Sequence, residues 1–168
     1  MKRHSGFTLI ELMVTLVVAA ILATIAIPSF WNTIQSNRAT TEANELVTAL
    51  HYARSEAIKR GARVSLCPST NQTGCTGGTN WANGWIIFVD TAASDGSAAA
   101  VGEVVRVWNA LSSSTSLSGP ASMRYRASGD VISAGDFIHQ LSGCTGDQRR
   151  TVSVAASGRV SATRSDCA

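Results

Sequence analysis

The chain opens with an apolar run long enough to dominate its folding. No charged residue lies between Leu12 and Ile27, and a short basic segment precedes the run. Counted from Phe7, about 21 residues rising roughly 1.5 Å each would make a helix as long as the hydrocarbon core of a bilayer is thick. The sequence therefore predicts a membrane-inserted helix, with its basic end in the cytoplasm and the rest of the chain outside.

One acid, Glu11, interrupts the apolar start of this helix. An ionised carboxylate near the centre of a bilayer costs about 2.5–3.5 kcal/mol, and somewhat less toward an edge. A secretory signal would have a shorter apolar core followed by small residues at a cleavage site. A plain signal anchor accounts for the length of the run but not for the acid. Because no Lys or Arg lies nearby in the helix, a buried carboxylate here needs a cation from elsewhere.

The residues around this acid, Gly-Phe-Thr-Leu-Ile-Glu at positions 6–11, closely resemble the processing motif of type IV prepilins and pseudopilins. In that family a prepilin peptidase cuts after the glycine and methylates the new N-terminal amine. The resemblance implies a leader peptide at residues 1–6, cleavage between Gly6 and Phe7, and N-methylation of Phe7. It also implies that Glu11 pairs with the terminal amine of a neighbouring subunit during assembly.

A second helical pattern follows the apolar run and continues to residue 60. Pro28 should kink the rod, because proline removes a backbone donor and clashes with the preceding turn. Beyond it, small and apolar residues recur every three or four positions, and polar residues occupy the opposite face. Lys59 and Arg60 followed by Gly61 predict the end of the helix. The apolar stripe consists of Ala43, Leu46, Leu50, Ala53 and Ala57.

Segments typical of strands, separated by turn residues, fill the rest of the chain. They are expected at 63–67, 85–90, 103–108, 123–127, 137–141, 151–155 and 159–163. The small, polar stretches 91–100 and 109–122 are expected to be exposed loops. Trp85 should lie in the core, whereas Trp81, between two asparagines, should be partly exposed. One long helix followed by strands indicates an α+β fold with the amphipathic half of the helix on antiparallel sheet.

All cysteines of the chain lie after the helix. They are Cys67, Cys75, Cys144 and Cys167. An even number of cysteines in a small exported domain is typical of disulfides. Of the three possible connectivities, we favour 67–75 with 144–167, which joins cysteines that are close in sequence. No Cys-x-x-Cys spacing is present and the histidines are scattered, so we expect no metal site and no cofactor.

Residue types that serve in enzymes are plentiful but form no catalytic pattern. There is no Gly-x-Ser-x-Gly elbow, and the glycine-rich stretch 74–78 lacks the lysine of a phosphate loop. His51 and His139 have no evident partner acid or nucleophile. Asp90 and the other aspartates at turn-like positions are expected to form turns and caps. The chain is therefore predicted not to be an enzyme, with no catalytic residues.

The second half of the chain resembles one particular group within that family. Residues 53–61, 64–67 and 81–90 (ARSEAIKRG, VSLC and WANGWIIFVD) are similar to the GspH/FimT group of minor pilins and pseudopilins. The loop at Cys67 and the tail resemble the FimT/FimU branch of type IV pili more than the secretion-system branch. The resemblance implies a type IV pilin-like fold whose long N-terminal helix has a protruding apolar half. Residues 7–34 would then be a transmembrane or filament-core helix, and residues 35–168 a periplasmic globular head.

The function that the resemblance implies is that of a minor pilin in assembly or priming of a type IV pilus at its tip. The implied partners are other major and minor pilins, the prepilin peptidase and the inner membrane. The chain would reside in the bacterial inner membrane, with its head in the periplasm, and in the extracellular pilus. A minor pseudopilin of a type II secretion system is an alternative. Without the leader, 12 cations face 11 acids, so no global charge attracts nucleic acid.

A local group of arginines near the C-terminus offers a further alternative. Its members are Arg149, Arg150, Arg159 and Arg164. A hairpin around residues 157–158 would let several guanidiniums project from one edge and contact phosphates. FimT-type minor pilins include members that bind DNA for uptake through Gly-Arg-x-Arg in this tail. Gly158 and Arg159 match that motif, but Ser161 replaces the second arginine. A receptor for double-stranded DNA in natural transformation thus competes with a merely solvated strand edge.

Overall fold

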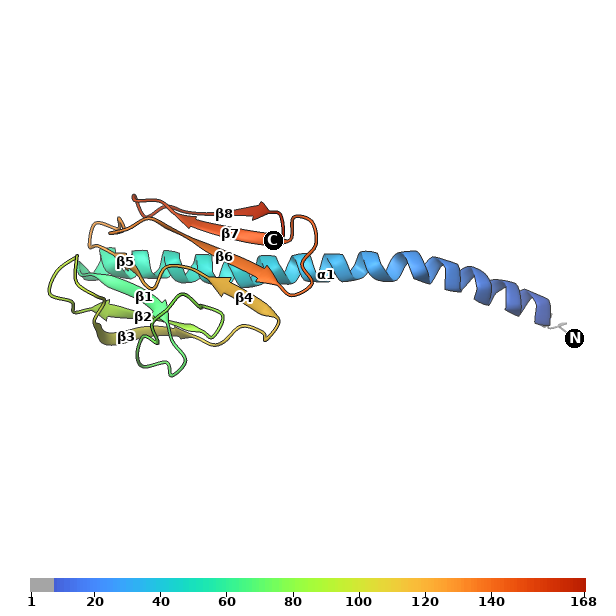
Figure 1. Ribbon diagram of the computed structural model, residues 1–168, viewed down its shortest axis with the longest axis horizontal. Helices are drawn as coiled ribbons and strands as arrows, with labels where there is room; N and C mark the ends of the chain where they lie inside the picture. The colour runs from blue at the N-terminus through green and yellow to red at the C-terminus, as the bar shows by residue number, and fades with distance from the viewer. Residues whose placement is uncertain (1–7) are drawn as a thin grey trace, which may run out of the picture.

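The computed structural model describes residues 8–168, without the side chains at positions 25 and 27–29. Helix α1 (Leu9–Arg60) runs along the molecule, and its N-terminal half projects away from the strands (Figure 1). The strands pack against one side of its C-terminal half, and together they form what we call the head. The strands are β1 (Val64–Pro68), β2 (Trp85–Asp90), β3 (Val101–Trp108), β4 (Thr115–Ser118), β5 (Met123–Tyr125), β6 (Gly135–Leu141), β7 (Arg149–Val154) and β8 (Val160–Ser165).

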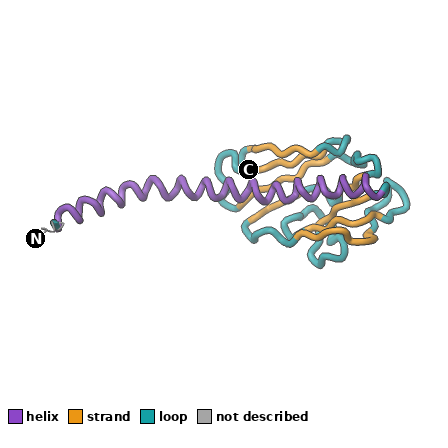
Figure 2. The backbone as a smooth tube through the Cα atoms, turned by 180° about the vertical axis from the view of Figure 1, so that it is seen from behind, coloured by secondary structure: helices purple, strands orange, loops and turns teal. Residues whose placement is uncertain are grey.

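The strands form two antiparallel sheets on the C-terminal half of α1 (Figure 2). The first has the order β3-β2-β1-β5 and the second the order β4-β6-β7-β8. β1 pairs with β2 from Val64↔Val89 to Pro68↔Trp85, and it pairs with β5 on its other side. The edge strands β3 and β8 consequently lie on opposite flanks of the head (Figure 1). The predicted α+β fold, with the C-terminal half of the helix packed on antiparallel sheet, is confirmed.

The sequence explains where α1 ends and how it packs. Gly61 adopts the left-handed conformation (φ 61°) and donates its N–H to the carbonyls of Ala57 and Ile58, which closes the helix as predicted. The helix is continuous through Pro28, and its ribbon follows a smooth curve instead of the expected sharp kink (Figure 1). A bend spread over several turns accommodates a missing donor with small changes at each residue.

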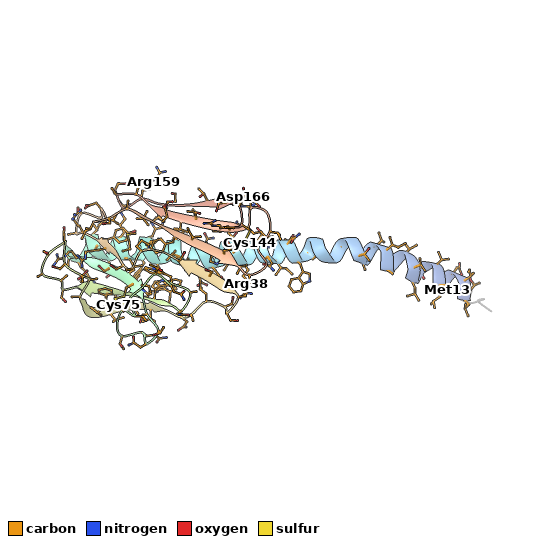
Figure 3. The ribbon with its side chains drawn as sticks, viewed as in Figure 1. Met13, Arg38, Cys75, Cys144, Arg159 and Asp166 are labelled. Atoms are coloured by element: carbon orange, nitrogen blue, oxygen red, sulfur yellow. A yellow bond between two sulfur atoms is a disulfide. The ribbon has the colours of Figure 1, made fainter. Side chains whose placement is uncertain are left out.

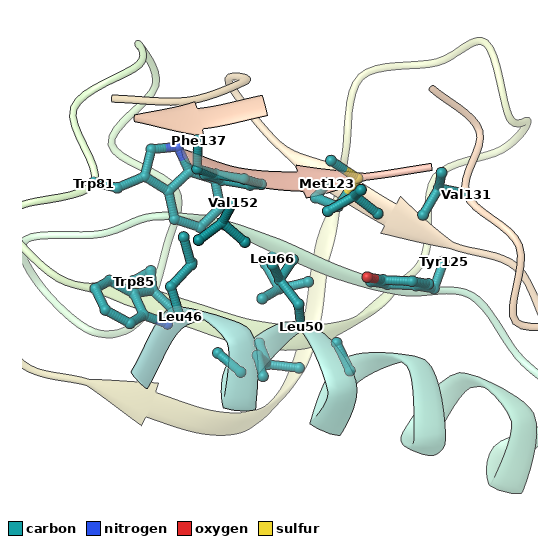
Figure 4. Close-up of a cluster of buried hydrophobic side chains, with 14 of the residues drawn as sticks. Leu46, Leu50, Leu66, Trp81, Trp85, Met123, Tyr125, Val131, Phe137 and Val152 are labelled. Atoms are coloured by element: carbon teal, nitrogen blue, oxygen red, sulfur yellow. The ribbon is translucent and has the colours of Figure 1, made fainter. Parts of the chain in front are cut away.

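The predicted apolar stripe of α1 forms one side of the hydrophobic core. All five of its residues are buried. Leu46 and Leu50 extend toward Leu66 of β1 on one side and toward Val152 of β7 on the other, so a single core joins both sheets to the helix (Figure 4). Trp85 also belongs to this core, as the sequence predicts.

The prediction that Trp81 is partly exposed is wrong, because this side chain is fully buried. Its ring packs edge-on against Phe137, with the centroids 4.9 Å apart, and its Nε1 donates to the carbonyl of Pro120 at 2.8 Å. The neighbouring asparagines do face solvent, but the indole itself closes the end of the core (Figure 4). Burial of a tryptophan requires such a partner for its N–H.

The expectation of an exposed loop at 109–122 is also incorrect in part. This stretch contains β4, which pairs with β6 from Thr115↔Leu141 to Ser118↔Ile138. Leu117 is its one core residue, and the serines and threonine beside it face away or lie at the edge. A single apolar residue in a short strand is too weak a pattern to indicate a sheet.

Both disulfides favoured by the sequence are present. Cys67 of β1 joins Cys75 in the loop that follows, and Cys144 joins Cys167, across sequence separations of 8 and 23. The first bridge fixes a loop at the end of β1, and the second ties the tail after β8 to the turn after β6 (Figure 3). Both loops therefore have restricted conformational freedom in the folded and the unfolded chain.

We predict that Trp81→Ala destabilises a head fragment beginning at residue 35 by about 3–5 kcal/mol, because it opens a cavity between the two sheets. Trp81→Phe should cost less, since it keeps a ring but leaves the Pro120 carbonyl without its donor. Chemical denaturation measures both free energies of unfolding. Val107→Ala, at an exposed position on β3, is the control and should stay within about 0.5 kcal/mol of the wild type. A Trp81→Ala fragment as stable as that control would contradict the buried placement.

Candidate functional site

The projecting half of α1 exposes large apolar side chains around its whole circumference. Leu9, Leu16 and Val17 are 77%, 62% and 60% exposed. The side chains around Met13 point away from the helix axis with no strand beside them (Figure 3). No ionisable residue lies between Glu11 and Arg38. Burial of such a surface is worth about 25 cal/mol per Å², so this half of the helix is a surface for an apolar partner.

The predicted processing positions at this end, Gly6 and Phe7, lie outside the described residues, as does the leader at 1–6. Within the part of the chain that the structure describes, no helix is both long enough and apolar enough to cross a membrane. The domain boundaries after residues 6 and 34 stay predictions.

Glu11 lies in the first turn of α1 and forms a capping box with Thr8. Its Oε2 accepts from the Thr8 N–H at 3.0 Å and from the Thr8 hydroxyl at 2.9 Å, and the Glu11 N–H donates to that hydroxyl at 3.3 Å. Thr-x-x-Glu before an apolar run is the sequence signal for this arrangement, which the sequence analysis missed. Among the described residues, Oε1 accepts no hydrogen bond. The carboxylate can therefore start the helix and still accept a bond from another molecule.

A second carboxylate, Glu42, joins α1 to the second sheet. Its Oε2 accepts from the Thr115 hydroxyl of β4 at 2.7 Å and lies 2.8 Å from Nε2 of His139 in β6, which is fully buried. Its Oε1 accepts from Nε of Arg38 at 2.9 Å. The sequence had indicated no partner acid for His139, because Glu42 is distant in the chain. No nucleophile stands in this group, which links the helix to two strands.

Burial by itself would raise the pKa of Glu42. The hydrogen bonds from His139, Thr115 and Arg38 outweigh that effect and hold its pKa below the ordinary value of 4.5. A carboxyl group with a lowered pKa in the folded state adds stability above its unfolded pKa, and this stability is lost as the pH falls through the folded pKa.

Asp90, expected to form a turn, does so and is also half of a buried ion pair. It accepts from the N–H groups of Ala92 and Ala100 at 2.9 and 3.0 Å, at both ends of the loop between β2 and β3. It also accepts from Nε of Arg124 at 2.5 Å and from the Ser65 hydroxyl at 2.6 Å. Burial opposes ionisation, but these bonds prevail and lower the pKa of Asp90. The group fixes β1, β2 and β5 to one another.

The C-terminal arginines do not form one cluster. β7 and β8 do make the expected hairpin, with Arg150 opposite Arg164. Arg150 is only 4% exposed, and its guanidinium donates to the Asp147 carbonyl at 2.8 Å and to the hydroxyls of Ser36 and Thr40, each at 3.2 Å. These bonds hold the hairpin on α1. The prediction that Arg150 could project outward with the others is therefore wrong, because the helix supplies its acceptors.

The other three arginines differ in their exposure and in their partners. Arg149 is half-buried, and Arg164 lies 3.4 Å from the Asp147 carboxylate in an exposed pair. Arg159 is exposed just before β8, at the opposite end of that strand from Asp166 (Figure 3). Phosphate contacts from this hairpin would come from Arg159 and Arg164 near the two ends of the edge strand β8, and not from one cluster of four.

Gly158, which precedes the exposed arginine, has a structural reason to be glycine. Its φ is +76°, and a Cβ there would lie 2.0 Å from the carbonyl oxygen of Gly129. That close approach lets Arg54 of α1 donate from Nε to the Gly129 carbonyl at 2.9 Å and from a terminal nitrogen to the Ser157 carbonyl at 3.1 Å. The Gly-Arg pair therefore marks a tight turn that rests on the helix.

We predict that Glu42→Gln lowers the free energy of unfolding of the head near neutral pH by about 1–3 kcal/mol, because it removes a charged acceptor from buried donors. The difference from the wild type should shrink as the pH falls through the lowered pKa of Glu42, where the wild-type carboxyl group protonates as well. Thermal or chemical unfolding near neutral pH and in acid measures it. Glu45→Gln, an exposed carboxylate on the same helix, should remain close to the wild type at each pH. A Glu42→Gln deficit that is unchanged in acid would contradict this account.

The chain matches known proteins in three comparisons: with family models, with individual sequences and with solved structures. Residues 42–158 match the family model described as Type II transport protein GspH, and residues 1–27 match the prokaryotic N-terminal methylation motif. Two fimbrial proteins of Pseudomonas aeruginosa are 41% identical over 64 residues, which span 38% of this chain. The matched segment covers only 41% of the length of those relatives.

Solved structures share the fold at low identity. The type IV minor pilin FimU of Pseudomonas aeruginosa superposes with a TM-score of 0.60 at 19% identity, covering 76% of this chain and 89% of FimU. The minor pseudopilin EpsH from the type 2 secretion system of Vibrio cholerae has a TM-score of 0.52 at 14% identity, covering 76% and 97%. Family and fold are those of structural subunits and not of enzymes. The chain belongs to the GspH family, and these likenesses confirm the predicted type IV pilin-like fold.

Proposed function

We propose that this chain is a minor pilin that joins a type IV pilus and acts in pilus assembly or priming at the tip. One observation carries the proposal: half of α1 is apolar on all sides, projects from the head, and has a single carboxylate at its start. Such a surface is unstable in water but suits the shared helical core of a filament. Before assembly the same segment, residues 7–34, holds the chain in the inner membrane with its head in the periplasm.

In this proposal, maturation takes place at Gly6 and Phe7, and assembly depends on Glu11 at the other end of the motif. A prepilin peptidase removes residues 1–6 and methylates the new N-terminal amine of Phe7. The free Oε1 of Glu11 then accepts from the terminal amine of a neighbouring subunit, while Oε2 keeps its bonds to Thr8. Because a lone carboxylate in an apolar filament core is costly, the pair forms only when two subunits are in the correct register.

A minor pseudopilin of a type II secretion system is the alternative, and it would use the same apolar helix to pack among other subunits. The family description and the likeness to EpsH support that alternative. The higher TM-score with FimU and the match to fimbrial proteins support the pilus. Partners recovered with the chain would separate the two, since each machine supplies its own major subunit.

DNA capture by the C-terminal hairpin is a second candidate function, favoured by the exposure of Arg159 and Arg164 beside the open edge of β8. If it operates, replacing Arg149, Arg159 and Arg164 together by Ala should abolish a gel shift of double-stranded DNA by the head fragment. Arg150 is left intact because its loss would detach the hairpin from α1. A head that shifts no DNA, or one whose shift survives the triple substitution, would exclude this function.

We predict that Glu11→Gln reduces incorporation into sheared pili about tenfold or more, because removal of one partner from a buried pair costs about 3–5 kcal/mol. Immunoblots of sheared pili against the membrane fraction measure this, and N-terminal sequencing of the membrane form should begin at methylated Phe7. Thr8→Ala is the matched control, since it breaks the capping box but keeps the carboxylate.

Near-normal incorporation of the Thr8→Ala chain beside a deficient Glu11→Gln chain would assign the effect to pairing. Equal losses in both variants would instead mean that Glu11 acts only as a helix cap. A mature chain that begins at any residue other than Phe7 would contradict the processing step.

A further inference from the structure

Arg106, on the edge strand β3, is held by two aromatic rings and by no counter-ion. Its guanidinium carbon lies 4.7 Å from the ring centroid of Trp108 and 5.1 Å from that of Tyr52. Trp108 in turn stacks on the buried Trp85, with centroids 6.1 Å apart and planes inclined by 14°. Within the described part of the chain, the guanidinium makes no hydrogen bond and no ion pair. Its N–H donors are thus fixed in place and open to another molecule.

This guanidinium lies on an open groove between α1 and β3. The groove has a volume of about 780 Å³, and its walls include Asn44 and Glu45 of the helix and Val107 and Asn109 of the β3 end. An arginine held on aromatic rings beside a rim of polar side chains is typical of a protein interface. The open, polar groove is unlike a site that encloses a small ligand.

The position of the groove indicates what can fill it. β3 and β8 form opposite flanks of the head (Figures 1 and 2). On the second sheet, Asp136 of β6 and Asp166 after β8 are exposed and have no ion pair among the described residues. Subunits that pack their helices side by side in one direction bring unlike flanks of adjacent heads together. An acid on one flank can then meet Arg106 on the other.

We propose that this groove receives a carboxylate from the head of a neighbouring pilin-type subunit, with Arg106 as the anchoring residue. This inference rests on the proposed function. The planar guanidinium can bind a carboxylate through two parallel hydrogen bonds. Because Tyr52 and Trp108 already orient it, little side-chain freedom is lost on binding. Glu45 on the facing wall of the groove attracts a hydrogen-bond donor or a cation of the partner and repels a second carboxylate. This charge pattern allows the partner's acid to bind at Arg106 in one position only.

A crosslinking experiment on the full-length chain in its native cells tests the contact. A photo-crosslinking amino acid replaces Asn44, which is exposed on the α1 wall of the groove, and the captured protein in membranes and sheared pili is identified by peptide sequencing. With Arg106 present, the product should be a pilin-type subunit linked through its head. Arg106→Glu should reduce that product about tenfold or more, and Arg106→Lys should reduce it less, since the charge remains but the planar fork is lost. Lys59→Glu, the same charge change at an exposed residue of α1 outside the groove lining, should leave the product unchanged.

A compensating substitution separates a lost contact from a damaged fold. An acid-to-arginine change at the crosslinked position of the partner should restore the product with Arg106→Glu. An undiminished product in Arg106→Glu, capture of a protein that is not a pilin-type subunit, or failure of every compensating change would each overturn the groove contact. The two proposals can fail separately. If the groove contact is overturned in this way but the wild-type chain enters pili and the Glu11→Gln chain does not, the proposed function still holds. Absence of the wild-type chain from pili would overturn both.

Discussion

The structure depends on one helix that is apolar in two different ways. In its C-terminal half a narrow stripe of alanine and leucine is buried between two sheets, and this contact organises the whole head. In its N-terminal half the apolar surface goes all the way round and meets no strand. Since the two halves are one continuous helix, the position of the head is coupled to whatever packs against the projecting half. A change in the partner of one half is therefore transmitted along a rod and not through a flexible linker.

Charged residues of the head mostly hold it together. Arg54 and Arg150 fasten the C-terminal hairpin to α1, Glu42 fastens β4 and β6, and Asp90 with Arg124 joins three strands of the first sheet. Buried groups of this kind are costly unless all are paired, so each is satisfied by segments distant in sequence. Arg106 differs from these residues, because two aromatic rings orient its guanidinium and no acid of the described chain pairs with it.

The features predictable from the sequence are those with a local cause. The stripe of α1 and its end at Gly61 follow from periodicity and capping, β2 was expected at its observed bounds, and the disulfides join cysteines close in sequence. Trp81 and Arg150 were misjudged because Pro120, Phe137, Ser36 and Thr40, which bury them, are far away in the chain. For the same reason the acid beside His139 could not be predicted. The arginine group appeared continuous in sequence, but strand alternation and a helix beneath it separate its members.

A filament of such subunits needs both adhesion and register, and the two requirements fall on different parts of the chain. Apolar packing of the projecting helices is strong but non-directional, and it would tolerate sliding or rotation of one subunit against the next. Directional contacts have to remove that freedom. The carboxylate of Glu11 can do so at one end of the rod, because it leaves one oxygen free while the other caps the helix. At the far end, only a polar contact between heads can fix rotation about the rod, and Arg106 is an oriented donor placed on the flank where such a contact would form.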